Sequence, residues 1–391
     1  MMAKPLEGLR VLDLTRFLAG PYCTMLLGDL GAEVLKIEPP GTGDPLRTQG
    51  PPFSDGEGIT FLAANRNKHS LGVDFNDAHA LARLCELAAR ADVFIENFRP
   101  GVMEKFHLDY ESLRQINPRL IYASISGMGA DGPQSTERAF DLTIQALGGY
   151  MSITGEKNGP PVKLGTSAFD VITGMNAFSG ILVALLERGR TGQGQRVETS
   201  LLEGQVAFLA NAALEYLLGF GVPGKLGSNH PQLVPYRSFA TRDGWIVIGA
   251  GIQNLFEKFM TALDRQDLIE HPQFLSLAAR LANRDLVDAT IEQETRHYLT
   301  QDLAQKLRES GVPCAPIATI DQVFDNPQVL HRKMIVNLPD SAQGRSLTLG
   351  SAVKYSRFDI TEGWKAPPTL NEGGESVAQS WLAAAQKVLK H

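Results

Sequence analysis

Several residue types and patterns are scarce in this chain of 391 residues. Its only cysteines, Cys23, Cys85 and Cys314, form neither a paired motif nor a metal-binding spacing, which is typical of reduced thiols in a cytoplasmic protein. The eight histidines are scattered, so we expect no metal site. Acidic residues outnumber basic ones, and a net charge of −6 argues against nucleic acid as a partner.

Long hydrophobic runs are also missing. The most apolar stretch, residues 171–186, is short for a membrane span and contains glycines, and the N-terminus lacks the apolar segment of a signal peptide. We therefore expect neither a membrane-spanning nor a secretory segment. A content of 43% hydrophobic and 20% charged residues is ordinary for a folded protein, and this length predicts more than one domain.

The first 130 residues alternate predicted strands with helices. Strands are predicted over 9–15, 33–38, 71–75, 92–95 and 120–126, with helices over 22–30 and 77–90. Strand–helix–strand units imply parallel pairing, and the later strands are continuously apolar, as in sheets covered on both faces. The predicted fold class is therefore α/β with a doubly wound, Rossmann-like sheet.

Beyond that region the pattern changes from a sheet to longer helices and then to a smaller α+β domain. The predicted elements are helices over 171–186 and 202–218 on either side of a strand over 196–200, a glycine- and proline-rich linker over 219–235, a strand over 244–249, amphipathic helices over 255–263, 284–299 and 302–309, a strand over 347–358 and a closing helix over 376–389.

One glycine motif invites a nucleotide-binding hypothesis. Gly127, Gly129 and Gly132 spell G-x-G-x-x-G directly after a predicted strand. Pro133 and polar residues follow, where the fingerprint requires an apolar helix, and the first strand–helix turn has a single glycine, Gly20. We therefore do not expect a nicotinamide or flavin cofactor.

Asp170 is the only ionisable residue between Lys163 and Glu187, and it comes at the head of the long apolar helix. It could cap the helix by accepting hydrogen bonds from the free N–H groups of the first turn. It could instead be a nucleophile or general base in a poorly solvated cleft. The stretch alone leaves both open. Small residues recur every three positions from Gly174 to Gly180 and predict a close approach of another backbone.

Short motifs follow one another in order along nearly the whole chain. They are Leu12-Asp13-Leu14-Thr15-Arg16, Ala19-Gly20-Pro21, Leu30-Gly31-Ala32-Glu33-Val34, Gly41-Thr42-Gly43-Asp44, Asn65-Arg66-Asn67-Lys68, Glu96-Asn97-Phe98-Arg99-Pro100-Gly101, Gly159-Pro160-Pro161-Val162, Gly192-Gln193-Gly194-Gln195 and Gly311-Val312-Pro313. In these motifs the chain resembles the class III CoA-transferases, which include formyl-CoA transferase and carnitine CoA-transferase. It is most similar to those that use succinyl-CoA with glutarate or itaconate.

The resemblance implies that Asp170 is the catalytic nucleophile. In this family the aspartate attacks the donor thioester, forms a mixed anhydride, and is then converted to an aspartyl-CoA thioester that the acceptor carboxylate resolves. Gly148 and Gly149 are candidates to stabilise the oxyanion. CoA is implied as a substrate, with no permanently bound cofactor.

The resemblance also places the CoA pocket. Its expected members are Val73, Asp74, Phe75, Asn76, Asn97, Phe98, Arg99, Lys105, Arg138 and Phe17, with the two cations Lys105 and Arg138 for phosphate. Lys105 considered alone is better explained as a solvated surface charge. A basic family position near the nucleotide is Pro39 here, so Arg47 is a candidate replacement.

Two further departures concern the acceptor. The glutamine of formyl-CoA transferase is Leu18 here, and the run of four glycines is absent, so oxalate is not expected. Arg16 is a candidate partner for the far carboxylate of a dicarboxylic acid, with a structural acid or CoA as the alternative. Phe140, Gly148 and Gly149 complete the expected substrate site. The predicted reaction is CoA transfer from succinyl-CoA to a C4–C6 dicarboxylate.

Two alternatives belong to other classes. An α-methylacyl-CoA racemase needs histidine directly before Asp141, where this chain has Phe140, and racemisation requires both bases. A non-catalytic CoA-binding protein would not need Asp170. The family architecture implies a homodimer of interlinked rings. Its large domain comes from both chain ends, residues 1–220 and 326–391, and a small α+β domain spans 221–325.

Overall fold

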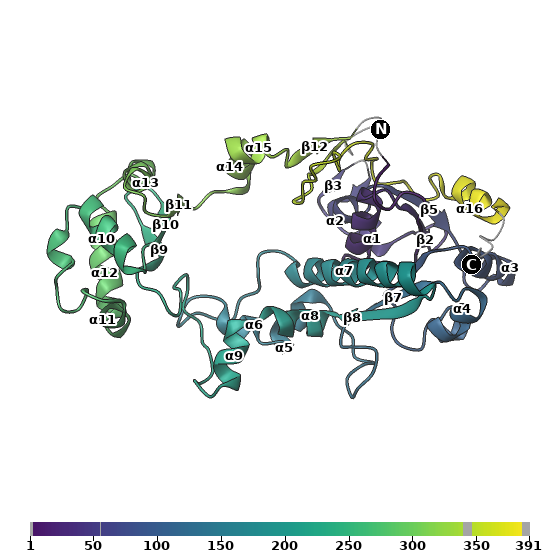
Figure 1. Cartoon of the computed structure of the whole chain (residues 1–391), viewed down its shortest axis with the longest axis horizontal. Coiled ribbons are helices and arrows are strands. Elements are labelled where there is room, and N and C mark those ends of the chain that lie inside the picture. Colours follow the sequence, from purple (N-terminus) through teal and green to yellow (C-terminus); the bar gives the residue numbers. More distant parts are fainter. Residues whose placement is uncertain (1–2, 55, 339–345, 385–391) are drawn as a thin grey trace. The chain divides into compact units, whose positions relative to one another are not determined.

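The computed structural model describes residues 3–54, 56–338 and 346–384. The chain forms two compact units, whose elements are labelled in Figure 1. The first unit contains Met1–Gly149, Leu164–Gly219 and Pro327–His391, and the second contains Tyr150–Lys163 and Phe220–Asn326. Segments from the beginning, middle and end of the chain therefore meet in one unit.

A six-stranded parallel sheet forms the centre of the first unit. Its order is β5-β2-β1-β6-β7-β8, so the sheet grows outward from β1 in both directions. This is the strand order of a doubly wound fold, which confirms the predicted α/β class. The strands are β1 (Arg10–Asp13), β2 (Glu33–Glu38), β5 (Lys68–Gly72), β6 (Val93–Glu96), β7 (Ile121–Ser126) and β8 (Gln195–Ser200).

Helices cover both faces of this sheet because successive strand residues are apolar on alternate faces. In β1, Val11 belongs to one hydrophobic core and Leu12 to the other. The core of Val11 includes α1 (Ala19–Asp29) and α7 (Ala168–Thr191). The core of Leu12 includes α3 (Ala78–Ala88), α4 (Tyr110–Ile116) and the C-terminal α16 (Gly374–Ala383), which lies beside α3 in Figure 1.

Helix α7 is longer than predicted, with 24 residues. A Cβ at Gly174 would lie 2.5 Å from the carbonyl oxygen of Ala19, so the small residue lets α1 and α7 pack closely, as its spacing predicted. By length and composition α7 is the one described helix that could span a membrane. A core helix meets the same criteria, and one side of α7 packs on α1 and the sheet.

Two predicted elements are shorter in the structure. The helix predicted over 202–218 is divided into α8 (Leu201–Phe208) and α9 (Asn211–Leu217), because Ala210 has φ of 47° and cannot continue the helical hydrogen bonds. The strand predicted over 347–358 contains only β13 (Leu347–Leu349), whose partner β12 (Ile335–Asn337) offers no further residues for pairing. The predicted closing helix is α16 (Gly374–Ala383), and the last predicted residues, 385–389, lie outside the described residues.

The other elements of the first unit connect the sheet to its helices. They are η1 (Pro45–Arg47), β3 (Phe53–Ser54), β4 (Glu57–Gly58), α2 (Ile59–Ala64), η2 (Glu104–Phe106), α5 (Asp141–Leu147) and α15 (Pro327–His331). The segment from Gly127 to Phe140 contains no helix, so its three glycines do not open a nucleotide-binding helix.

The second unit has its own core on an antiparallel sheet of order β11-β10-β9. Buried Ile246, Ile248 and Phe239 of the sheet pack with Phe256 and Phe259 of α10. Its elements are α6 (Tyr150–Ile153), β9 (Tyr236–Ala240), β10 (Trp245–Gly249), α10 (Gln253–Ala262), η3 (Gln266–Leu268), α11 (Leu277–Ala282), α12 (Arg284–Thr295), α13 (Thr300–Glu309), β11 (Cys314–Pro316) and α14 (Ile320–Asp325).

Candidate functional site

A cavity of about 320 Å³ lies at the carboxyl ends of β1, β6 and β7, entirely within the first unit. The sheet order reverses between β1 and β6, and doubly wound proteins bind ligands at this switch point. The predicted site residues that line the cavity are Arg16, Phe17, Asn97, Phe98, Arg99, Arg138, Phe140 and Asp170. Residues that are far apart in sequence thus meet around one carboxylate.

The remaining predicted residues do not line this cavity. Phe75 is joined to it through a ring contact with Phe98 at 6.3 Å, and Phe106, next to exposed Lys105, contacts Phe75 at 5.2 Å. Gly148 ends α5 and leaves no room for a Cβ beside the Gln205 amide. The others outside the lining are Val73, Asp74 and Asn76 after β5, Leu18 before α1, and Gly149.

Asp170 is the third residue of α7, and its side chain does not cap the helix. The N-cap position is Ser167, and no hydrogen bond joins the Asp170 carboxylate to any other described residue. Instead, Asp141 Oδ1 accepts a hydrogen bond from the backbone N–H of Phe169 at 3.0 Å. A neighbouring helix therefore satisfies the first turn of α7, and the carboxylate of Asp170 is left facing the cavity.

Asp141 and Gln145, both buried on α5, hold the segment that leads to Asp170. The Gln145 amide donates to Asp141 Oδ2 at 2.5 Å, and its oxygen accepts from the N–H of Leu164 at 2.9 Å. Together with the bond to Phe169, α5 thus fixes both ends of residues 164–169. Sequence reasoning missed this role. The only signal was an acid and an amide four residues apart on one helix face.

The surroundings of Asp170 change its acidity. Burial and, to a smaller extent, the negative charge of Asp141 together raise the pKa of Asp170 to about 7. At neutral pH a large fraction of this carboxylate is therefore ionised while remaining poorly solvated. A weakly solvated anion is a stronger nucleophile than one in water, which is the environment expected of a catalytic carboxylate.

Arg16 lies in the loop after β1, and the turn after β6 holds its backbone beside the cavity. Asn97 accepts from the N–H of Arg16 at 2.8 Å and donates to its carbonyl oxygen at 2.7 Å. The guanidinium lies over the ring of Phe98, 4.4 Å from its centroid. Its buried Nε has no hydrogen-bond partner among the described residues, and burial lowers the pKa of Arg16. This guanidinium can therefore still bind an anion.

Buried charges beneath the site hold the loop after β1. The ammonium of Lys36 donates to the Thr15 carbonyl oxygen at 2.7 Å and to Asp44 at 3.0 Å. Asp44 in turn accepts from the N–H of Phe17, which has φ of 63°, at 3.4 Å. A non-glycine residue in this conformation is maintained only by surrounding contacts. The ion pair thus fixes the loop that carries Arg16.

Arg47, the candidate replacement for the basic position at Pro39, is committed elsewhere. Its guanidinium is buried and pairs with Glu38 at 2.7 Å and Glu57 at 2.7 Å. Because its N–H groups bind these two carboxylates, the Arg47 guanidinium has no pair of N–H donors left to bind a phosphate. The exposed cations at the cavity are Arg99 and Arg138.

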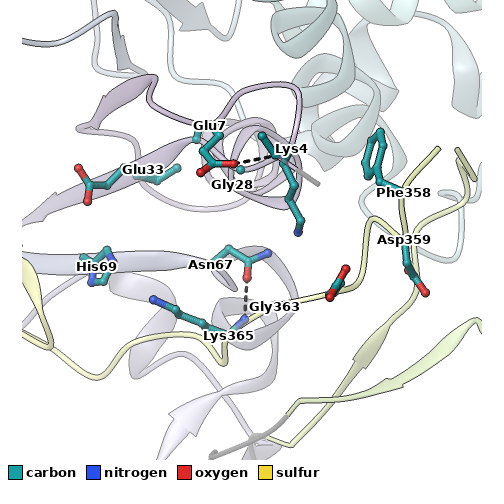
Figure 2. Close-up of a pocket in the computed structure, with 15 residues that line it drawn as sticks. Lys4, Glu7, Gly28, Glu33, Asn67, His69, Phe358, Asp359, Gly363 and Lys365 are labelled. Atoms are coloured by element: carbon teal, nitrogen blue, oxygen red, sulfur yellow. Dashed lines mark hydrogen bonds between the residues drawn. The ribbon is translucent and has the colours of Figure 1, made fainter. Parts of the chain in front are cut away.

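A larger cavity, of about 490 Å³, lies at the amino ends of β2 and β5 (Figure 2). None of the predicted site residues lines it. Its polar groups are partly joined to one another, since Lys4 N–H donates to Glu7 and Lys365 N–H donates to Asn67. The described residues contain no cluster of three or more potential metal ligands. The smaller cavity is therefore the candidate site.

Comparison with known proteins identifies the family. The model of "CoA-transferase family III" matches residues 6–373, which is nearly the whole chain. The chain belongs to CoA-transferase family III. The predicted enzyme class, a CoA-transferase that uses CoA thioesters as substrates, is thus confirmed.

Among its relatives, this family III CoA-transferase is 40% identical to human (Homo sapiens) succinyl-CoA:glutarate CoA-transferase over 369 residues, covering 94% of this chain and 84% of the relative. It is 36% identical to acetyl-CoA:oxalate CoA-transferase of Acetobacter aceti over 384 residues, covering 98% and 97%. A crystal structure of a CAIB/BAIF family protein from Brucella suis matches with a TM-score of 0.87 and 37% identity, covering 97% and 100%.

Proposed function

We propose that this family III CoA-transferase moves CoA from succinyl-CoA to a C4–C6 dicarboxylate through an aspartyl-CoA thioester on Asp170. The observation that carries the proposal is the Asp170 carboxylate itself. It faces a cavity lined by cations, has no hydrogen-bond partner among the described residues, and has a pKa raised to about 7 by burial. An unpartnered, poorly solvated carboxylate is costly to fold around and is suited to nucleophilic attack.

The proposed steps balance without any net proton transfer. A carboxylate oxygen of Asp170 attacks the thioester carbonyl, the C–S bond breaks, and CoA thiolate leaves a mixed anhydride. The thiolate attacks the aspartyl carbonyl and releases succinate, which gives the aspartyl-CoA thioester. The acceptor carboxylate then attacks that thioester and expels the thiolate. Finally the thiolate attacks the acceptor acyl carbon, which forms the new CoA ester and frees Asp170.

The site matches the charges of this exchange. Each step replaces one anion by another, so positive charge is needed at the cavity but no acid–base pair is. Arg16, Arg99 and Arg138 supply that charge, and no histidine or cysteine lines the cavity. For CoA, we place the phosphates near Arg99, Arg138 and Lys105. The nucleotide then lies along residues 73–76, where the rings of Phe75 and Phe98 meet.

The assignment of a dicarboxylate acceptor is supported by Arg16. Its guanidinium forms no ion pair with a described residue, although the charge of Asp44 acts on it, and we therefore favour a substrate carboxylate over a structural acid as its partner. A planar guanidinium fits a second carboxylate at the far end of the acyl chain. The named relatives act on glutarate and on oxalate, both dicarboxylates. We favour the longer acid because Leu18 stands at the position of the glutamine found in formyl-CoA transferase.

Racemisation is disfavoured by Phe140. Its ring forms an edge-on contact with Phe17, with centroids 6.0 Å apart, and both rings line the cavity. An aromatic hydrocarbon at this position can neither accept nor donate a proton, so a two-base mechanism lacks one base.

We also propose a homodimer with interlinked subunits, supported by an exposed apolar surface. Val183 and Leu186 on α7 are 63% and 73% exposed, and Leu217 and Leu218 at the end of α9 are 72% and 68% exposed. Large apolar side chains exposed to this extent on neighbouring turns of a helix are typical of association surfaces. Sedimentation velocity across a dilution series should show dimer without folded monomer. A folded monomer that increases on dilution would contradict interlinking.

The intermediate provides the direct test of transfer. After mixing with succinyl-CoA and rapid acid quench, mass spectrometry of digested protein should show a CoA-sized adduct on the peptide containing Asp170. Asp170→Ala should show none under the same conditions. Retained tight binding of CoA with no adduct from any donor would instead support a non-catalytic binding protein.

A further inference from the structure

Glu96 is a buried carboxylate beside the cavity that the proposed steps do not use. It ends β6 and is 5% exposed. Its Oε2 accepts from the backbone N–H of Phe98 at 2.8 Å, and its Oε1 accepts from the hydroxyl of Ser124, on neighbouring β7, at 2.6 Å. One carboxylate thus fixes the turn between β6 and the cavity by a bond to each side. Burying a carboxylate costs free energy, so we expect this one to have a physical role that offsets the cost.

The turn that Glu96 holds is the support of Arg16. Asn97, the next residue, binds both backbone polar groups of Arg16, and the ring of Phe98 lies under the guanidinium. The ring of Phe98 also contacts Phe75, in the segment after β5. Moving the Phe98 backbone would therefore move the platform on which Arg16 rests, while leaving Asp170 on its own helix.

We propose that Glu96 is a positioning residue that holds Phe98 under Arg16 and thereby sets the preference for acyl groups with a free far carboxylate. The inference rests on the proposed function, because it takes Arg16 as the receptor for that carboxylate. Glu96 acts through Phe98 and does not line the cavity itself. Its expected effect is therefore on discrimination between acyl groups rather than on attack by Asp170.

The charge state of Glu96 should make the discrimination between acyl groups depend on pH. Burial raises the pKa of Glu96 to about 7. Glu104 on η2 raises it and Arg196 on β8 lowers it, while Ser124 and Tyr122 on β7 face it as neutral groups. Protonation places a hydrogen on one of the two carboxylate oxygens. That oxygen then accepts the hydrogen bond from Phe98 or Ser124 less well. The discrimination should accordingly weaken as the pH falls from 8 to 6.

The test measures binding in Asp170→Asn, which cannot form the intermediate and removes the titration of Asp170. Dissociation constants for glutaryl-CoA and pentanoyl-CoA, which differ only in the far carboxylate, are measured by calorimetry at pH 8. We expect glutaryl-CoA to bind at least about tenfold more tightly, as a charge-assisted pair provides. Adding Glu96→Ala should reduce this ratio at least about fivefold, beyond any weakening that both esters share because Phe98 also belongs to the proposed CoA pocket.

The variants also separate the possible failures. Glu111→Ala, an exposed acid on α4, is the matched control and should leave the ratio unchanged. If Glu96→Ala does not fold, Glu96→Gln should still give a lowered ratio that no longer varies between pH 6 and 8. An unchanged ratio, or equal weakening of both esters, would overturn the role of Glu96. A ratio near one with Glu96 intact would overturn the Arg16 receptor, whereas failure of transfer itself appears only in the adduct experiment.

Discussion

Replacing Asp170 with asparagine is expected to lower kcat/KM for CoA transfer by about four orders of magnitude. Asparagine has nearly the same shape but offers no anionic oxygen, so neither the mixed anhydride nor the aspartyl thioester can form. Because the side chain has no hydrogen-bond partner among the described residues, the loss cannot be attributed to a broken network. The measurement is chromatographic detection of the new CoA ester at a fixed concentration of succinyl-CoA, with glutarate varied at concentrations below its KM.

A stability measurement shows whether the Asp170→Asn protein is folded. The folded-state pKa of Asp170 is raised from 3.8 to about 7. The wild type therefore loses stability as the pH rises through this interval, by at most about 4 kcal/mol, and asparagine does not. The variant should melt at a higher temperature than the wild type at pH 8 and similarly at pH 4. Asp131→Asn, which changes an exposed aspartate of the same unit, should alter neither activity nor melting.

Normal activity of Asp170→Asn would remove the basis of the proposed mechanism. A lost activity accompanied by a lower melting temperature at pH 8 would contradict the description of Asp170 as a poorly solvated carboxylate. Only loss of activity together with unchanged or increased stability agrees with both the position and the proposed role of the side chain.

Replacing Arg16 with glutamine is expected to produce the second largest effect, on one class of acceptor only. For glutarate, kcat/KM should fall about 100-fold, because a charge-assisted bidentate pair is lost from a half-buried position. For pentanoate, which has the same chain length and no far carboxylate, it should change less than about threefold. In both assays the donor is an analogue of succinyl-CoA that lacks the second carboxylate. Binding of the donor then does not depend on Arg16.

The control for Arg16→Gln is Arg114→Gln, an exposed arginine on α4 that pairs with Glu111 at 2.6 Å. It should leave both acceptors unaffected, since exposed ion pairs contribute little. An equal loss for glutarate and pentanoate would show that Arg16 binds CoA or supports the fold. The loop held by Asn97 makes such a general role measurable as a lowered melting temperature.

Local patterns in the sequence were sufficient for the strands of the parallel sheet and for the fold class, whereas the role of Asp170 is a prediction that came from the family resemblance. Apolar strands joined by short helices require parallel pairing. The small residue at Gly174 also predicted a close helix contact, which the structure places between α7 and α1. These inferences held because each depends on neighbours in the chain.

Only the tertiary structure decided what surrounds Asp170. Asp141 caps α7 from another helix, and Glu96 and Asn97 hold the turn that places Phe98 under Arg16. Arg47 forms ion pairs with Glu38 and Glu57. The contacts of Asp141 with α7 and of Asn97 with Arg16 join residues that are distant in sequence, and they depend on which strand ends lie side by side in the folded sheet. The same reason explains the broken helix at Ala210, since no local pattern records a backbone conformation imposed by packing.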